Sequence, residues 1–174
     1  MLDKTFTSWF AIQVVVRAES KVARLLQYRG HELFLPTYRI RRQWSDRLKS
    51  VDLPLFPGYV FCRLGDVSAG LVLSTLSVIR IVSFGGKPTP ISEQEIESLR
   101  VVSTVGEKLE PCAYLPIGQR VQIVRGPLSG ISGLLTQNRN RHRLIISVDA
   151  IMKSVSVEID ANDIRVLEAH AKAS

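Results

Sequence analysis

The spacing of apolar residues changes near residue 104, and this change constrains the fold more than any other feature. Before it, apolar residues recur at helical spacing in 19–29 and 92–102 and alternate at strand spacing elsewhere. From residue 117 onward, five short apolar runs are separated by turns that carry glycine, which predicts a small five-stranded barrel. The predicted segments are an N-terminal domain at 8–104, a linker at 105–116, the barrel at 117–168 and a disordered tail at 169–174.

The N-terminal domain is predicted to be an α+β fold, with helices flanking a mostly antiparallel sheet in the order β-α-β-β-α-β-α. Residues 8–16 are apolar on both faces, as expected for a central strand. A helical stripe follows and stops at Gly30, a residue that suits the end of a helix. Asp66 is expected to cap a short helix, and Ser92 with Glu95 has the spacing of a capping box that opens a third.

The net charge of +7 over 174 residues favours an anionic partner. The longest apolar runs are far too short to cross a bilayer, and the N-terminus shows no basic segment followed by an apolar one. Cys62 and Cys112 have no CxxC spacing and no histidines at metal-ligand spacing. We therefore expect a cytoplasmic protein with no membrane association, no metal and no cofactor.

The residue types and spacings do not support catalysis. Gly85, Gly86 and Lys87 resemble the end of a phosphate-binding loop, but that pattern also requires glycine at position 81 and serine or threonine at position 88. Ile81 and Pro88 occupy those positions. None of the three histidines is near a cysteine or serine with an orienting acid, as nucleophilic catalysis would require. The protein is expected not to be an enzyme.

Residues 56–61, Phe-Pro-Gly-Tyr-Val-Phe, place three aromatic side chains within six positions. Pro57 and Gly58 favour a turn, after which Tyr59 and Phe61 point to one face of a strand. Two interpretations remain open at this point. The strand could belong to an ordinary core, as periodic apolar residues usually do, or its aromatic face could be a docking surface, because Tyr and Phe are enriched at interfaces.

A run of positive charge between residues 39 and 49 is predicted to lie on an exposed hairpin or loop. Its cations are Arg39, Arg41, Arg42, Arg47 and Lys49, with Asp46 as the one acid within the run. Such a run is often only a solvated face, but arginines beside Tyr38 and Trp44 also suit phosphate contact and base stacking. Ser74 and Thr75 could add hydroxyl contacts to a nucleic acid.

Four motifs, in order along the chain, resemble those of NusG-type transcription elongation and antitermination factors. They are Trp-Phe-Ala-Ile-Gln-Val at 9–14, the aromatic stretch 56–61, the turn 84–90 that runs into 92–95, and Val-Gln-Ile-Val-Arg-Gly-Pro-Leu-Ser-Gly-Ile-Ser-Gly at 121–133. The last is similar to the KOW motif, with Gly126, Pro127, Gly130 and Gly133, followed by a tip that carries Arg139 and Arg141. Four motifs over residues 8–168 are far more specific than a KOW motif alone, which several ribosomal proteins carry.

The resemblance implies an N-terminal domain that docks on the clamp helices of the largest RNA polymerase subunit. By position, the docking residues would be Gln13, Phe56, Pro57, Gly58, Tyr59, Phe61 and Phe84. It also implies contact with non-template DNA or nascent RNA, for which the run 39–49 with Ser74 and Thr75 is suitably placed. The C-terminal domain would be an SH3-like barrel that binds a small-subunit ribosomal protein or the termination factor Rho, and the protein would be a monomer.

Two departures from the family pattern bear on the barrel. Residues 151–154, Ile-Met-Lys-Ser, replace an Ile-Phe-Gly-Arg-like turn, and the tip 139–143 is richer in arginine than is usual. Both suggest a specialised antiterminator that resembles RfaH-type paralogues. The rival interpretation is a KOW-type RNA-binding protein of ribosomal kind, which would bind RNA through the tip 139–143. The sequence favours the alternative that this tip is a soluble loop.

Overall fold

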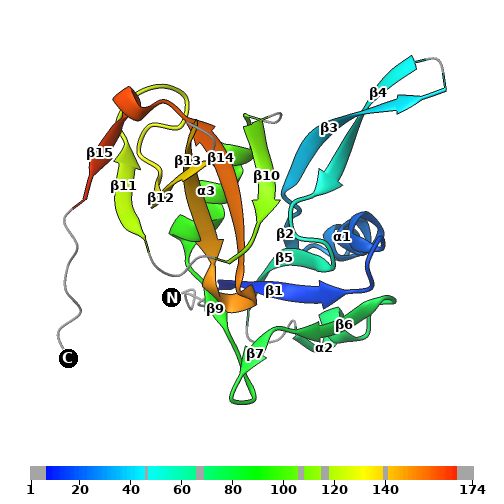
Figure 1. The fold of residues 1–174 in the computed structure, drawn as a ribbon. Coiled ribbons are helices and arrows are strands. Elements are labelled where there is room, and N and C mark those ends of the chain that lie inside the picture. The colour runs from blue at the N-terminus through cyan, green and yellow to red at the C-terminus, as the bar shows by residue number, and fades with distance from the viewer. Residues whose placement is uncertain are drawn as a thin grey trace. The chain divides into compact units, whose positions relative to one another are not determined.

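The computed structural model describes residues 7–45, 47–65, 69–105, 108–114, 118–138 and 141–167 (Figure 1). Within them the protein is a mixed α/β fold with antiparallel sheets and few helices. Contacts divide the chain into two units, and the domain boundary near residue 104 stays a prediction. Unit 1 comprises Met1–Thr37, Pro54–Ile96 and Asp149–Ile151, and unit 2 comprises Tyr38–Leu53, Glu97–Val148 and Met152–Ser174. The predicted tail at 169–174 lies outside the described residues.

Unit 1 is built on an antiparallel sheet in the order β2-β5-β1-β6, with β9 also paired to β1. Its strands are β1 (Ser8–Val14), β2 (Glu32–Phe34), β5 (Tyr59–Leu64), β6 (Val78–Ile81) and β9 (Pro90–Ile91). The predicted central position of the first strand is confirmed, because β1 pairs with β5, β6 and β9. Trp9 and Ala11 are buried on one face and Ile12 and Val14 on the other, whereas Gln13 is only half-buried.

Helices α1 (Glu19–Tyr28) and α2 (Ala69–Leu73) cover one face of this sheet. Val22 and Leu26 of α1 and Val72 of α2 pack on the side chains that the strands direct to that face. As predicted, α1 ends before Gly30, which adopts a φ of +87° that other residues rarely reach. The predicted cap of α2 at Asp66 lies outside the described residues.

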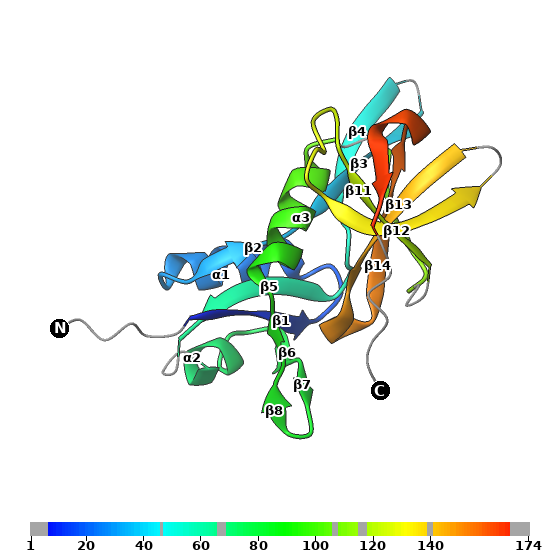
Figure 2. The ribbon, with the colours of Figure 1, turned by 90° about the vertical axis from the view of Figure 1, so that its left-hand side faces the viewer.

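Two short elements lead from β6 to the third helix. Strands β7 (Ser83–Phe84) and β8 (Lys87–Pro88) form a ribbon that projects from the sheet of unit 1 in both views (Figures 1 and 2). Helix α3 (Glu93–Ser103) then begins with the predicted capping box. The Ser92 backbone N–H donates to Glu95 Oε2 at 3.0 Å, and the Glu95 N–H donates to Ser92 Oγ at 3.2 Å.

The basic run lies on strands β3 (Thr37–Trp44) and β4 (Arg47–Pro54), which pair only with each other among the described strands. A two-residue connection at 45–46 joins them, and Ser45 has a φ of +48°. Positive φ is what a tight hairpin turn requires. Nearly every residue between 39 and 52 is exposed, so the expectation of an exposed hairpin is confirmed.

The C-terminal part forms a six-stranded antiparallel sheet in the order β10-β14-β13-β12-β11-β15. Its strands are β10 (Leu109–Cys112), β11 (Gln119–Ile123), β12 (Ser132–Asn138), β13 (Arg141–Val148), β14 (Lys153–Ile159) and β15 (Ile164–Val166). The five predicted strands are present, but β10 is an addition inside the predicted linker. No pairing between the end strands β10 and β15 is found among the described residues, so a closed barrel stays a prediction.

Candidate docking surface and nucleic-acid interface

The turn 56–58 connects the hairpin to β5 and is fixed by backbone hydrogen bonds. Gly58 has a φ of +83°, its carbonyl accepts the Val14 N–H at 2.8 Å, and the Tyr59 N–H donates to the Phe56 carbonyl at 3.1 Å. A Cβ at position 58 would lie 3.5 Å from both the Val14 carbonyl oxygen and Val16 Cγ2. Space alone would admit a side chain, but the positive φ favours glycine. Pro57, at the tip of the turn, is exposed.

Glu19 holds the same turn from the first turn of α1. It is 3% exposed, and its Oε1 accepts the Gly58 backbone N–H at 2.7 Å. Sequence reasoning missed this residue, because an acid at a helix N-terminus already has an ordinary explanation in the helix dipole. Its hydrogen bond with the Gly58 N–H joins two segments 39 positions apart and is visible only in the folded structure.

Two of the predicted docking aromatics belong to the packing of unit 1. Phe56 and Phe61 are 1% and 0% exposed, and their ring centroids are 5.8 Å apart in an edge-to-face arrangement. Phe61 also lies 6.2 Å from the Phe34 ring. The core interpretation therefore describes these two rings, which support the strand from within and present no surface in this conformation. Tyr59, at the start of the strand, is only half-buried.

Gln13, Tyr59 and Arg80 form a row across three neighbouring strands. In the sheet register Gln13 lies opposite Tyr59 on β5 and opposite Arg80 on β6, so the three side chains share one face. Arg80 Nε donates to Gln13 Oε1 at 2.7 Å and fixes the amide orientation. Arg80 was not predicted from the sequence, because a single arginine between two isoleucines matches no binding motif. Phe84 of the projecting ribbon, another predicted docking residue, is 86% exposed.

Arg63 lies on the same face of β5 as Tyr59, two rows further along the strand, and contacts its neighbours there. Its guanidinium contacts Glu32 at 3.1 Å and Glu93, in the first turn of α3, at 2.7 Å. It also lies over the Trp9 ring, 5.6 Å from the centroid. Register places Arg63 opposite both Trp9 and Glu32. This end of β5 is therefore occupied by internal contacts, whereas the Tyr59 end keeps an accessible polar and aromatic row.

On the β3–β4 hairpin, Arg39 is paired with an acid outside the basic run. Its Nε and Nη2 donate to the two carboxylate oxygens of Asp52 at 2.8 and 3.3 Å. The hydrogen bond from Arg39, together with its charge, lowers the pKa of the Asp52 carboxyl. Lys49 lies 5.2 Å from the Trp44 ring centroid. The exposed cations Arg42 and Arg47 have no acidic partner within the described part of the chain.

Ser74 and Thr75 follow α2 in unit 1, whereas the hairpin cations belong to unit 2. Thr75 is buried, and its Oγ1 donates to the Leu71 carbonyl at 3.0 Å and accepts from Arg29 Nη1 at 2.8 Å. Ser74 is exposed, and its hydroxyl donates to the same Leu71 carbonyl. The Thr75 hydroxyl therefore joins the end of α1 to the end of α2 and is not directed to solvent, contrary to its expected role in nucleic-acid contact.

The glycines of the KOW-like stretch serve different purposes. Gly126 and Gly130 adopt φ values of +79° and +93° in the turn between β11 and β12. Gly133 is needed for close strand approach, because a Cβ there would collide with the Ile145 carbonyl oxygen and press on the Leu144 side chain. Pro127, which follows Gly126 in this turn, is exposed. Arg139 lies outside the described residues.

The arginines at the start of β13 contact acids of β14 and of β10, the strand beyond β14 in the sheet order. Arg141 contacts Glu158 of β14 at 2.8 Å, and Arg143 contacts Glu110 of β10 at 2.6 Å. Arg143 Nε also donates to Ser156 Oγ at 3.1 Å. Cross-strand ion pairs of this kind stabilise the sheet and reduce the positive charge available to RNA.

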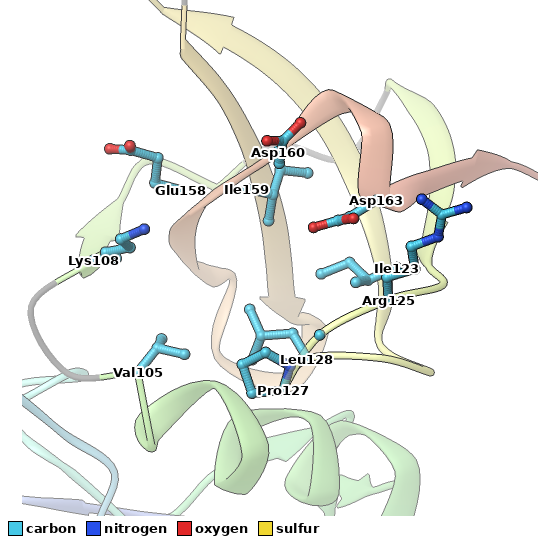
Figure 3. A pocket seen from close by; sticks show the side chains of 11 residues that line it. Val105, Lys108, Ile123, Arg125, Pro127, Leu128, Glu158, Ile159, Asp160 and Asp163 are labelled. Carbon is cyan, nitrogen blue, oxygen red and sulfur yellow. The ribbon is translucent and has the colours of Figure 1, made fainter.

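A cavity of about 310 Å³ lies beside the KOW-like turn within unit 2 (Figure 3). Ile159 and Leu128 extend toward it from opposite sides, with Ile123 and Pro127 completing an apolar lining. Its charged lining residues are Lys108, Arg125, Glu158, Asp160 and Asp163. Charges of both signs surround an apolar floor, which suits a peptide side chain better than a phosphate.

Both cysteines are free thiols. Burial raises the pKa of the Cys62 thiol to about 12 and also raises the pKa of the half-buried Cys112 thiol. In the described part of the chain, no group of three or more His, Cys, Asp or Glu side chains is placed to hold a metal ion. None of the helices formed by the described residues is long and apolar enough to cross a membrane.

Comparison with known proteins decides the family. A family model described as the transcription termination factor NusG matches residues 7–100. The transcription termination/antitermination protein NusG of Lactococcus lactis is 32% identical over 92% of this chain and 94% of its own. The chain belongs to the NusG family. The protein of the same description from Thermus thermophilus is 27% identical over 90% of this chain and 96% of its own.

The fold is similar to that of a solved NusG. The structure titled "Domain interaction in Thermotoga maritima NusG" matches with a TM-score of 0.56 at 20% identity. It covers 93% of this chain and 98% of the Thermotoga chain. The NusG family model spans the unit 1 sheet and the β3–β4 hairpin, so both the turn 56–58 and the basic run lie in the matched region.

Proposed function

We propose that this NusG-family protein is a transcription elongation and antitermination factor that docks on the clamp helices of the largest RNA polymerase subunit. The observation that carries the proposal is the accessible row of Gln13, Tyr59 and Arg80 beside the exposed Pro57. An aromatic ring with fixed polar neighbours is typical of an interface anchor. Bound there, the protein would brace the clamp closed and reduce pausing.

Phe56, Phe61 and Gly58 have a supporting role in this proposal, since all three are buried. The direct contacts would come from Gln13, Pro57, Tyr59 and the ribbon residue Phe84. An exposed phenylalanine at the end of a short ribbon is a costly surface feature in water, and a protein partner would cover it. The aromatic stretch 56–61 thus contributes both the anchor and the packing that holds it.

Nucleic-acid contact is proposed for the β3–β4 hairpin, chiefly through Arg42, Arg47 and Lys49. Phosphate neutralisation by exposed cations is sensitive to salt, and Trp44 beside Lys49 provides a ring for base stacking. Non-template DNA and nascent RNA offer the same chemistry. The cross-strand ion pairs of Arg141 and Arg143 weigh against the rival proposal of a ribosomal KOW-type RNA-binding protein.

The C-terminal sheet is proposed to be an SH3-like barrel that recruits a further factor, such as a small-subunit ribosomal protein or Rho. The cavity lined by Leu128 and Ile159 would accept an apolar side chain of such a partner. Met152 is exposed in the turn where the family pattern differs, which supports a specialised paralogue with its own partner.

The docking proposal is tested by measuring binding of the full-length chain to core RNA polymerase by size-exclusion co-elution and by a titration. Tyr59→Ala is expected to abolish co-elution while its circular dichroism and unfolding midpoint stay close to wild type. Tyr28→Ala is the matched control, because Tyr28 is an exposed tyrosine on α1. Absence of binding by the wild type, or equal binding by Tyr59→Ala, would refute the proposal.

A further inference from the structure

Glu19 is a buried acid whose role goes beyond opening α1. A carboxylate can be buried without a large penalty only where hydrogen bonds replace its lost hydration. At Glu19, 3% exposed, the replacement comes from the backbone N–H of Gly58, 2.7 Å from Oε1. The acid and the amide it holds are 39 positions apart, so this contact fixes the turn to the helix rather than stabilising either one locally.

Gly58 has no side chain that could hold its conformation, so the turn depends on its two peptide groups. The N–H is bound by Glu19 and the carbonyl by the Val14 N–H at 2.8 Å. Its φ of +83° is one of many values open to glycine, and removal of either hydrogen bond would release the turn to other conformations. A buried N–H left without an acceptor also favours any conformation that returns it to water.

We propose that Glu19 is a positioning residue for polymerase binding, acting through Gly58. This inference rests on the proposed docking function of the turn. Held by Glu19, the Gly58 amide sets the direction in which Pro57 leaves the sheet and Tyr59 enters β5. Glu19 is buried and does not itself touch the partner. Binding energy that would otherwise be lost in ordering a glycine turn is thereby preserved.

Three variants of the full-length chain separate positioning from general stability. Glu19→Leu keeps a side chain of similar size and removes the acceptor, whereas Glu19→Gln keeps a side-chain oxygen at the same place. Glu95→Leu is the matched control, because Glu95 also accepts a backbone N–H in unit 1, that of Ser92 at 3.0 Å, but at the start of α3. Each variant is titrated against core RNA polymerase, and amide hydrogen exchange is followed at Gly58.

We expect Glu19→Leu to bind polymerase about tenfold more weakly and to speed exchange of the Gly58 amide. Glu19→Gln and Glu95→Leu should bind within about twofold of the wild type. Wild-type affinity of Glu19→Leu would overturn the inference, as would equal losses in Glu19→Leu and either comparison variant. A wild-type protein that fails to bind polymerase would refute the docking function itself and the inference with it. Unchanged Glu19→Leu binding beside a defective Tyr59→Ala would refute the inference alone.

Discussion

Arg39 and Asp52 face each other across the β3–β4 hairpin, with two nitrogen–oxygen contacts of 2.8 and 3.3 Å. A two-residue connection after Trp44 places position 39 opposite position 52, so the pairing follows from hairpin register. The pair has no net charge, and its guanidinium and carboxylate already bind each other. Salt-sensitive binding by the hairpin should therefore depend on its other cations.

Replacement of Arg42 and Arg47 by alanine is expected to weaken single-stranded DNA binding and to reduce its salt dependence. Each lost phosphate contact should lower the slope of log affinity against log salt by about 0.7. The measurement is a fluorescence anisotropy titration at several salt concentrations. The control is Arg39→Ala with Asp52→Ala, which removes an ion pair without changing the net charge. A slope that falls as much in the control as in the Arg42 and Arg47 variant would contradict the assignment.

Phe61→Ala is expected to destabilise unit 1 rather than remove a binding contact. The ring is fully buried against Phe34 and Phe56, and deletion of such a ring costs about 3–5 kcal/mol of unfolding free energy. Urea unfolding followed by circular dichroism measures the loss. Tyr59→Ala, at a half-buried position on the same strand, should lose clearly less. Equal stability of Phe61→Ala and the wild type would return this residue to the docking surface.

Two glycines of the KOW-like stretch should respond differently to alanine. At Gly130, a Cβ meets nothing within 4 Å, so Gly130→Ala should cost only the positive-φ penalty of about 1–2 kcal/mol. At Gly133, the Cβ would collide with the Ile145 carbonyl, so the β12–β13 pairing must shift. We expect a larger loss for Gly133→Ala, measured by thermal unfolding and by amide exchange in β13. The opposite order would show that β12 can move without penalty.

Local patterns predicted much of the fold. The Ser92–Glu95 capping box, the helix stop at Gly30 and the five C-terminal strands depend on spacing within a few residues, and the structure contains all of them. Strand β10 was missed because Pro111 indicates a linker. The strand lies at an end of the sheet order, where proline is tolerated since no second neighbour needs its missing N–H.

The features of the candidate site that the sequence did not predict depend on contacts between residues far apart in the chain. The sequence indicated the aromatic stretch but left open which rings are buried, because both interpretations give the same alternation. The roles of Glu19 and Thr75 depend on contacts with Gly58 and Arg29, which lie 39 and 46 positions away. Asp52 was overlooked because it lies three residues beyond the basic run, although hairpin register returns it to Arg39.

Cys62 provides a test of the unit 1 core through pH. Burial raises the pKa of its thiol from 9.0 to about 12, so the folded protein binds a proton that the unfolded chain releases above pH 9. The stabilisation from the protonated thiol is therefore complete below pH 9 and is lost as the pH rises toward 12. Unfolding free energies from urea titrations between pH 8 and 11 should fall more steeply for the wild type than for Cys62→Ala.

At pH 8 a thiol reagent should modify Cys112, which is half-exposed, well before Cys62. Parallel pH curves for the two proteins, or early modification of Cys62 in the folded state, would show that the core opens around this strand.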